Sequence, residues 1–326
     1  MKKKPPVYHY ESVFAKDMYD YLRFRASQGY QCCAEPYIFK TLDAYLCRLT
    51  SSDAPITAEL VDEWIQSITA RQNTKTGYIS SFRQFAKYLR SLGYTVYMPD
   101  PPRCAKAYVP HIFTQDELRR LFAASDNLNA KYGATYAPIQ IPVLLRILYG
   151  CGLRVGETLA LQNKDIDWLE KTLLLRNTKG HKDRLVPMSD SVADVCRAYY
   201  DLFHPSKNQE DYFFHNKLNQ EYPLVWAFVW MKRTLEAAGI DPLQETQNSR
   251  AIGLHCLRHT FAVHSLDRQN DRGIDRYYSV PILSTYLGHE DIYGTETYLR
   301  LTSERHTKIV SDMSACSERI FSEVQL

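Results

Sequence analysis

The sequence predicts a mainly α-helical protein with one small β-hairpin, divided into two domains. Apolar residues recur at three- and four-residue steps through residues 8–98, which is typical of helices packed in a bundle. Pro99, Pro101 and Pro102 then interrupt the pattern, because proline lacks an amide donor and disfavours helix in the residue before it. Two short apolar strands within residues 171–187 predict the hairpin in the otherwise helical second half.

The N-terminal part predicts a bundle of about four helices. The first two have apolar residues at helical spacing, and further helices start near Thr57 and Thr76. The apolar residues of the first two are Phe14, Met18, Tyr21, Leu22, Phe39, Leu42, Tyr45 and Leu46. We therefore predict a helical domain over residues 1–103, a linker over residues 104–112 and a second domain over residues 113–326.

The second domain opens with a helix signalled by a capping box, in which Thr114 and Glu117 satisfy each other's backbone amides. An apolar helix over residues 139–149 follows and ends at Gly150-Cys151-Gly152. The remaining predicted elements are strands at 171–176 and 184–187 around a turn, helices near 191–200, 224–238, 254–266 and 280–287, and a polar segment from residue 302.

Composition is that of an ordinary globular protein, with 45% hydrophobic and 24% charged residues. No apolar run reaches the roughly 20 residues of a membrane span, and no apolar segment follows the basic N-terminus as in a signal peptide. The eight cysteines form no C-x-x-C pair, so neither a zinc site nor a disulfide framework is indicated. We expect a soluble, cytoplasmic protein that does not bind a membrane.

Charge is distributed unevenly along the chain. Residues 1–110 carry 15 Lys and Arg against 10 Asp and Glu, whereas the whole chain has a net charge of +3. A basic N-terminal part favours a nucleic-acid partner, although an excess of this size is also common on solvated surfaces.

Three separated strings carry residues suited to phosphodiester chemistry. A guanidinium group binds phosphate with two parallel hydrogen bonds and keeps its charge, while histidine moves protons and tyrosine can act as a nucleophile. The strings are Gly152-Leu153-Arg154-Val155-Gly156-Glu157, His255-Cys256-Leu257-Arg258-His259, and Leu287-Gly288-His289 with Tyr298 nine residues after the histidine. In order and spacing they resemble the tyrosine recombinases, the phage integrase family of DNA breaking and joining enzymes.

The resemblance implies a fold and a set of roles. Residues 1–103 become a helical core-binding domain that contacts DNA, and residues 113–326 a mixed α/β catalytic domain with a C-terminal tail. No cofactor or metal is implied. The implied site consists of Arg154 and Arg258 as phosphate clamps, Lys179 as the acid for the leaving 5′ oxygen, His255 as the proton-handling residue, His289 beside the nucleophile Tyr298, and Glu157 and His259 as supports.

Three assignments have alternatives. His255 and His259 lie four residues apart, a spacing that also suits two metal ligands, but Cys256 stands where metallohydrolases have glutamate and no third ligand is evident. Lys182 lies three residues after Lys179. Tyrosines near His289 are most often packing residues, and family spacing alone selects Tyr298 over Tyr286 and Tyr293.

The chain departs from the family pattern in places. A polar stretch over residues 267–276 separates the second and third strings, and it is either a solvated loop or a contact with DNA or a neighbouring subunit. Arg300 stands where many members have histidine. The tail over residues 302–326 either docks on an adjacent protomer, as in the family, or covers its own domain.

The resemblance implies a site-specific recombinase that joins strands through a 3′-phosphotyrosyl intermediate, in integration or excision of a mobile element or in replicon resolution. Its partners are double-stranded DNA with specific recombination sites and three further copies of itself in a homo-tetramer. The alternatives are a type IB topoisomerase-like enzyme and a catalytically inactive DNA-binding relative.

Overall fold

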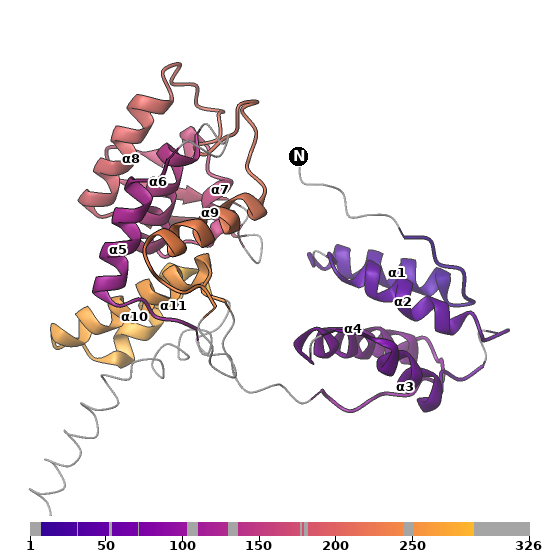
Figure 1. Ribbon diagram of the computed structural model, residues 1–326. Coiled ribbons are helices and arrows are strands. Elements are labelled where there is room, and N and C mark those ends of the chain that lie inside the picture. Colours follow the sequence, from indigo (N-terminus) through magenta and orange to yellow (C-terminus); the bar gives the residue numbers. More distant parts are fainter. Residues whose placement is uncertain are drawn as a thin grey trace, which may run out of the picture. The chain divides into compact units, whose positions relative to one another are not determined.

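The computed structural model describes residues 8–30, 32–51, 54–70, 72–102, 110–129, 136–176, 178, 182–243 and 251–289. The chain divides into two compact units, Met1–Ala107 and Tyr108–Leu326. Residues 104–109 of the predicted linker lie outside the described ranges. The secondary structure is mainly helical with one small sheet, so the predicted fold class is confirmed (Figure 1).

The described part of the first unit contains four helices around one apolar core. They are α1 (Ala15–Ser27), α2 (Glu35–Leu46), α3 (Ala58–Ser67) and α4 (Gln72–Ser91). Phe14, Phe39, Trp64 and Phe85 are fully buried in this core. The predicted start near Thr76 was wrong: α4 begins at Gln72, and the Thr76 hydroxyl donates to the Gln72 carbonyl inside the helix instead of capping its end.

Seven helices of the second unit lie within the described ranges. They are α5 (Gln115–Asp126), α6 (Ala137–Gly150), α7 (Val155–Leu159), α8 (Asp190–Phe203), α9 (Leu224–Ala237), α10 (Leu254–Asp271) and α11 (Arg276–Leu287). Helix α6 is apolar on nearly every side and packs against α5, α8, α9 and α10, so it forms the centre of the unit. The predicted capping box at the start of α5 is present, with Thr114 and Glu117 each bonded to the other's backbone amide.

The sheet has three antiparallel strands in the order β1 (Ile166–Asp167), β2 (Thr172–Leu175), β3 (Arg184–Pro187). Leu173 pairs with Val186 in the β2–β3 hairpin, and both side chains are buried against the helices. The predicted hairpin is therefore present. Strand β1 was not predicted, because two residues are too short to show an alternating pattern.

The polar stretch over residues 267–276 is not one loop. Helix α10 continues to Asp271, and α11 already begins at Arg276. Gly273 ends α10 in the left-handed conformation, at φ +75°, and the amide of Ile274 donates to the carbonyl of Gln269 as in a Schellman motif. Polar residues such as Arg and Gln are good helix formers on a solvated face, so polarity alone did not mark the helix end.

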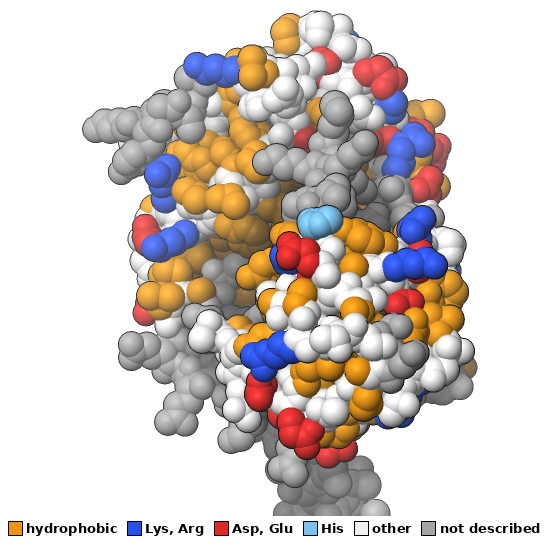
Figure 2. Space-filling view, turned by 90° about the vertical axis from the view of Figure 1, so that its right-hand side faces the viewer, with side chains coloured by type: hydrophobic (Ala, Val, Ile, Leu, Met, Phe, Trp, Pro, Cys, Tyr) orange, Lys and Arg blue, Asp and Glu red, His pale blue; other side chains and the backbone are white. Residues whose placement is uncertain are grey.

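The described surface mixes residue types. Figure 2 shows Lys and Arg side chains dispersed among acidic and hydrophobic ones on the face drawn. Helix α9 exposes Leu224, Val225, Phe228 and Val229 along one side. Within the described ranges, no helix combines the length and the hydropathy needed to cross a membrane.

Candidate active site

The first site segment is the turn into α7, where an arginine and a glutamate bind each other. Arg154 is the N-cap residue of α7, and Glu157 is the third residue of that helix. The Glu157 carboxylate accepts the Arg154 backbone amide at 3.0 Å and the Arg154 Nη1 at 2.7 Å. A carboxylate at this helix position reaches back to the N-cap amide, so the local backbone positions Glu157, and the Nη1 bond then holds the Arg154 side chain beside it.

A second arginine binds the same carboxylate. Arg184, from β3, donates from Nη1 to Glu157 Oε1 at 3.0 Å and from Nη2 to Oε2 at 2.8 Å. Burial by itself would raise the pKa of Glu157, but the hydrogen bonds from Arg184 and from the Arg154 backbone outweigh it and lower the pKa to about 2. Glu157 is therefore a permanent anion at neutral pH.

Arg184 was not among the predicted site residues, because Leu185 and Val186 are both apolar and the sequence does not show which face of the strand turns inward. Residues 184 and 186 of a strand share a face, and Val186 is fully buried on that face while Leu185 is 65% exposed. A charged residue on the inward face of a strand needs a charged partner. The burial pattern of the folded strand shows that Arg184 turns inward, and the structure shows that its partner is Glu157.

Arg258, on α10, ties the three predicted strings together. Its side chain is 1% exposed. Nη1 donates to the Gly152 carbonyl at 2.7 Å and Nη2 to the Leu287 carbonyl at 2.8 Å. The guanidinium thus joins the turn before α7 to the end of α11, and its role as a phosphate clamp stays a prediction.

His255 and His259 lie one turn apart on α10, with ring centroids 4.5 Å apart. Burial and the positive charges of Arg258 and Arg154 lower the pKa of His255 to about 4. Burial, His255, Arg258 and His289 lower the pKa of His259 to about 3. Both imidazoles are therefore neutral at pH 7. A neutral imidazole can accept a proton, but the lowered pKa makes each of these two a weaker base than an exposed histidine.

The third string, Leu287-Gly288-His289, lies at the C-terminal end of α11. Gly288 adopts φ +66°, and the His289 amide donates to the Ser284 carbonyl at 3.1 Å, so the Leu287-Gly288-His289 string is the C-terminal cap of the helix. The Gly288 carbonyl accepts Arg154 Nη2 at 3.2 Å. Because a left-handed residue is strained with any Cβ, glycine allows this turn to close over Arg154.

The structure thus brings together Arg154, Glu157, His255, Arg258, His259 and His289. Lys179 and Tyr298 lie outside the described residues, as does Tyr293. Tyr286 is described: it stacks on Phe261, its hydroxyl donates to the Pro187 carbonyl at 3.3 Å, and burial raises its pKa. A phenol that is harder to ionise is a poorer nucleophile, so Tyr286 has the properties of a packing residue.

The alternative interpretation of His255 and His259 as metal ligands finds no third ligand among the described residues. Among the residues that the structure describes, no three His, Cys, Asp or Glu side chains are grouped so that they could hold a metal ion.

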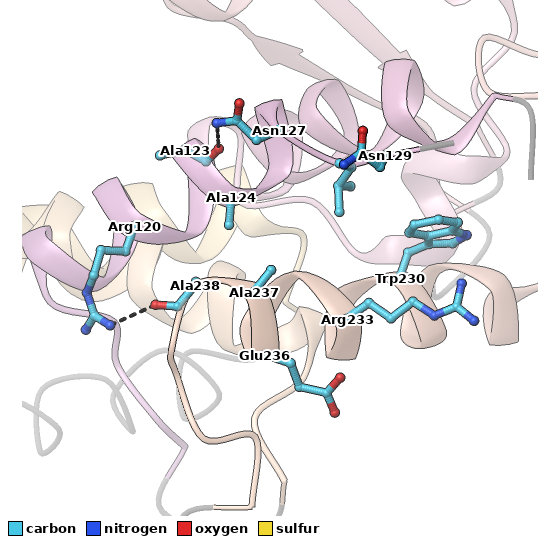
Figure 3. Close-up of a pocket in the computed structure, with 11 residues that line it drawn as sticks. Arg120, Ala123, Ala124, Asn127, Asn129, Trp230, Arg233, Glu236, Ala237 and Ala238 are labelled. Atoms are coloured by element: carbon cyan, nitrogen blue, oxygen red, sulfur yellow. Dashed lines mark hydrogen bonds between the residues drawn. The ribbon is translucent and has the colours of Figure 1, made fainter. Parts of the chain in front are cut away.

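A cavity of about 770 Å³ lies between α5 and α9, and none of its lining residues belongs to the arginine and histidine set. Arg120 crosses its end and donates to the Ala238 carbonyl at 2.9 Å (Figure 3). This contact fixes the C-terminal end of α9 against α5, and the cavity is separate from the site.

Comparison with known protein sequences identifies the family of this chain. Residues 111–305 match the model of the phage integrase family. A putative integrase/recombinase, y4rB, from Sinorhizobium fredii is 28% identical over 303 residues, which cover 88% of this chain and 93% of the relative. A tyrosine recombinase from Thermosipho africanus is 27% identical over 238 residues, covering 72% of this chain and 74% of the relative.

Solved structures agree on the fold. The XerH site-specific recombinase bound to its palindromic difH substrate aligns with a TM-score of 0.61 at 18% identity, over 85% of this chain and 78% of that one. The chain therefore belongs to the phage integrase family. It is a tyrosine-type recombinase, an enzyme that breaks and rejoins DNA strands, and the resemblance seen in the motifs is confirmed.

Proposed function

We propose that the protein is a site-specific recombinase that cuts a DNA strand by forming a 3′-phosphotyrosyl bond through Tyr298. The observation that carries this proposal is the convergence of three distant strings: Arg154 bonds to Gly288, and Arg258 bonds to both Gly152 and Leu287. These bonds link two guanidinium-bearing segments to the turn that bears His289. Tyr298 follows that turn by nine residues.

The proposed reaction needs no energy source. The phenolic oxygen of Tyr298 attacks the phosphorus and its proton passes to the imidazole of His255, whose lowered pKa is raised by the negative charge of the bound phosphodiester. The bond from phosphorus to the 5′ oxygen breaks as Lys179 donates a proton to that oxygen. Arg154 and Arg258 stabilise the charge on the nonbridging oxygens, which is the largest contribution expected in such a site. A second 5′ hydroxyl reverses the steps and reseals the strand.

Double-stranded DNA with specific recombination sites is the proposed substrate. The solved XerH site-specific recombinase is bound to a palindromic difH substrate, and phosphate contacts should supply most of the affinity and make it salt-dependent. The first unit serves as the core-binding domain, and the protein acts in the cytoplasm as a homo-tetramer on two duplexes. Integration or excision of a mobile element, or replicon resolution, is the biological setting.

Covalent capture tests the proposal. Purified protein is incubated with a random-sequence pool of nicked duplexes, and DNA that stays attached after SDS is recovered and sequenced. We expect one sequence class with paired inverted motifs, and Tyr298→Phe should bind these duplexes normally and form no adduct. An adduct that persists in Tyr298→Phe would show that another residue is the nucleophile.

Two further assays separate the alternatives. Relaxation of any supercoiled plasmid without strand exchange between captured sites would favour the type IB topoisomerase-like function. Sequence-specific binding with no adduct from the wild-type protein would favour an inactive DNA-binding relative.

A further inference from the structure

Arg184 lies inside the site, and both Nη atoms of its guanidinium bind the carboxylate of Glu157. Each of its Nη atoms donates to a different oxygen of Glu157, at 3.0 and 2.8 Å. The side chains of Arg184 and Glu157 are 12% and 10% exposed. Exposed ion pairs contribute little, but a buried bidentate pair is costly to break because it leaves an uncompensated charge.

The charge balance of the cluster depends on this residue. Glu157 Oε1 accepts both Arg184 Nη1 and Arg154 Nη1, so one carboxylate is shared by two guanidinium groups. Arg154, Arg184 and Glu157 together carry a net positive charge, since two guanidinium groups share one carboxylate. Without Arg184, the anion of Glu157 would be balanced by Arg154 alone, and the positive charge that Arg154 offers to a phosphate would be reduced.

Arg184 also lies against the turn that leads to His289. A Cβ added to Gly288 would stand 3.0 Å from Arg184 Nη1 and 3.2 Å from its Cδ. Arg184 Nε is buried and has no hydrogen-bond partner among the described residues. The contact of the side chain with the Gly288 turn is one of packing. The same guanidinium therefore supports the Arg154 turn through Glu157 and the Gly288 turn by direct packing.

We propose that Arg184 is a positioning residue for strand cleavage: it holds Glu157, and through it Arg154, and supports the turn that carries His289. This inference rests on the proposed function. It assigns to β3 a part in the reaction that none of the predicted site residues supplies.

The test compares Arg184→Gln and Arg184→Lys with a matched control. Arg146 forms a bidentate pair with Asp126 of the same geometry, at 2.8 and 2.7 Å, between α6 and α5 and apart from the site residues. This pair is more exposed, at 25% and 48%, so Arg146→Gln controls for the loss of a bidentate ion pair, and thermal unfolding accounts for the difference in burial. Single-turnover formation of the SDS-resistant adduct is measured on captured duplexes at saturating protein. DNA binding and thermal unfolding are measured in parallel.

We expect Arg184→Gln to lower the cleavage rate about 10- to 100-fold with binding within threefold of wild type, since small displacements of a catalytic group have effects of this order. Arg184→Lys, which keeps the charge and loses the fork, should lower the rate at least fivefold and carries the test if the glutamine variant does not fold. Arg146→Gln should cleave at the wild-type rate. A rate loss below fivefold in the Arg184 variants would overturn the proposal.

A double variant separates positioning from direct contact with the phosphate. If Arg184 acts through Glu157, Arg184→Gln combined with Glu157→Gln should cleave no more slowly than the slower single variant. Rate losses that multiply would overturn the assignment through Glu157. Absence of any wild-type adduct would reject the proposed function and this inference with it, whereas wild-type adduct with an unchanged Arg184 variant would reject the inference alone.

Discussion

Gly288→Ala should slow DNA cleavage in addition to lowering the stability of the protein. Gly288 has φ +66°, and this left-handed conformation costs a residue with a Cβ about 1–2 kcal/mol. For a unit of this size that loss lowers the melting temperature by about 2–8 °C. The new Cβ would also stand 3.0 Å from Arg184 Nη1, so the guanidinium or the turn must shift by a few tenths of an ångström. Because the Gly288 carbonyl accepts Arg154 Nη2, we expect adduct formation to slow about tenfold.

Gly273→Ala is the matched control for this variant. Gly273 has φ +75° at the end of α10, and nothing lies within 4 Å of an added Cβ. It should lose about the same 1–2 kcal/mol of stability and cleave DNA at the wild-type rate. Thermal unfolding and single-turnover adduct formation are measured for both. Equal cleavage rates in the two variants would refute the reasoning, because they would show that the contact at Gly288 does not affect the site.

Three further predictions follow from the site. Tyr286→Phe should cost about 0.5 kcal/mol or less in unfolding free energy, because its bond to the Pro187 carbonyl is long at 3.3 Å and exposed, and should leave adduct formation unchanged; loss of the adduct would make Tyr286 the candidate nucleophile. The folded-state pKa of Glu157 is about 2 against an ordinary value of 4.5, so its contribution to stability is present above pH 4.5 and is lost as pH falls toward 2. Glu157→Gln should therefore flatten the stability profile over that range, and parallel acid-unfolding curves would contradict this. EDTA should leave the cleavage rate unchanged, because guanidinium groups supply the charge, and inactivation reversed by added metal would revive the metal site at His255 and His259.

The sequence predicted correctly those features that depend on interactions between residues close together in the chain. The capping box at Thr114 and Glu117 and the β2–β3 hairpin lie where the patterns predicted them. Each depends on residues close in the chain, whose backbone and hydrogen bonds follow from their own spacing. The end of α10 was also set by a local signal, Gly273, and the prediction missed it because the polar residues before the glycine were read as the end of the helix.

Sequence by itself determined the family, the helical class and the position of the motifs, since these depend on residue types at fixed spacing. Only the tertiary structure decided which side chains and backbone groups of the site bind one another. Arg258 finds acceptors 106 and 29 residues away, and Arg184 finds its carboxylate 27 residues back. A buried charge requires an opposite charge or carbonyl acceptors, but the periodicity of a strand or helix shows only which face is buried and not what lies across it. For that reason Arg184 could be identified as part of the site only once the structure showed its bonds to Glu157 of α7.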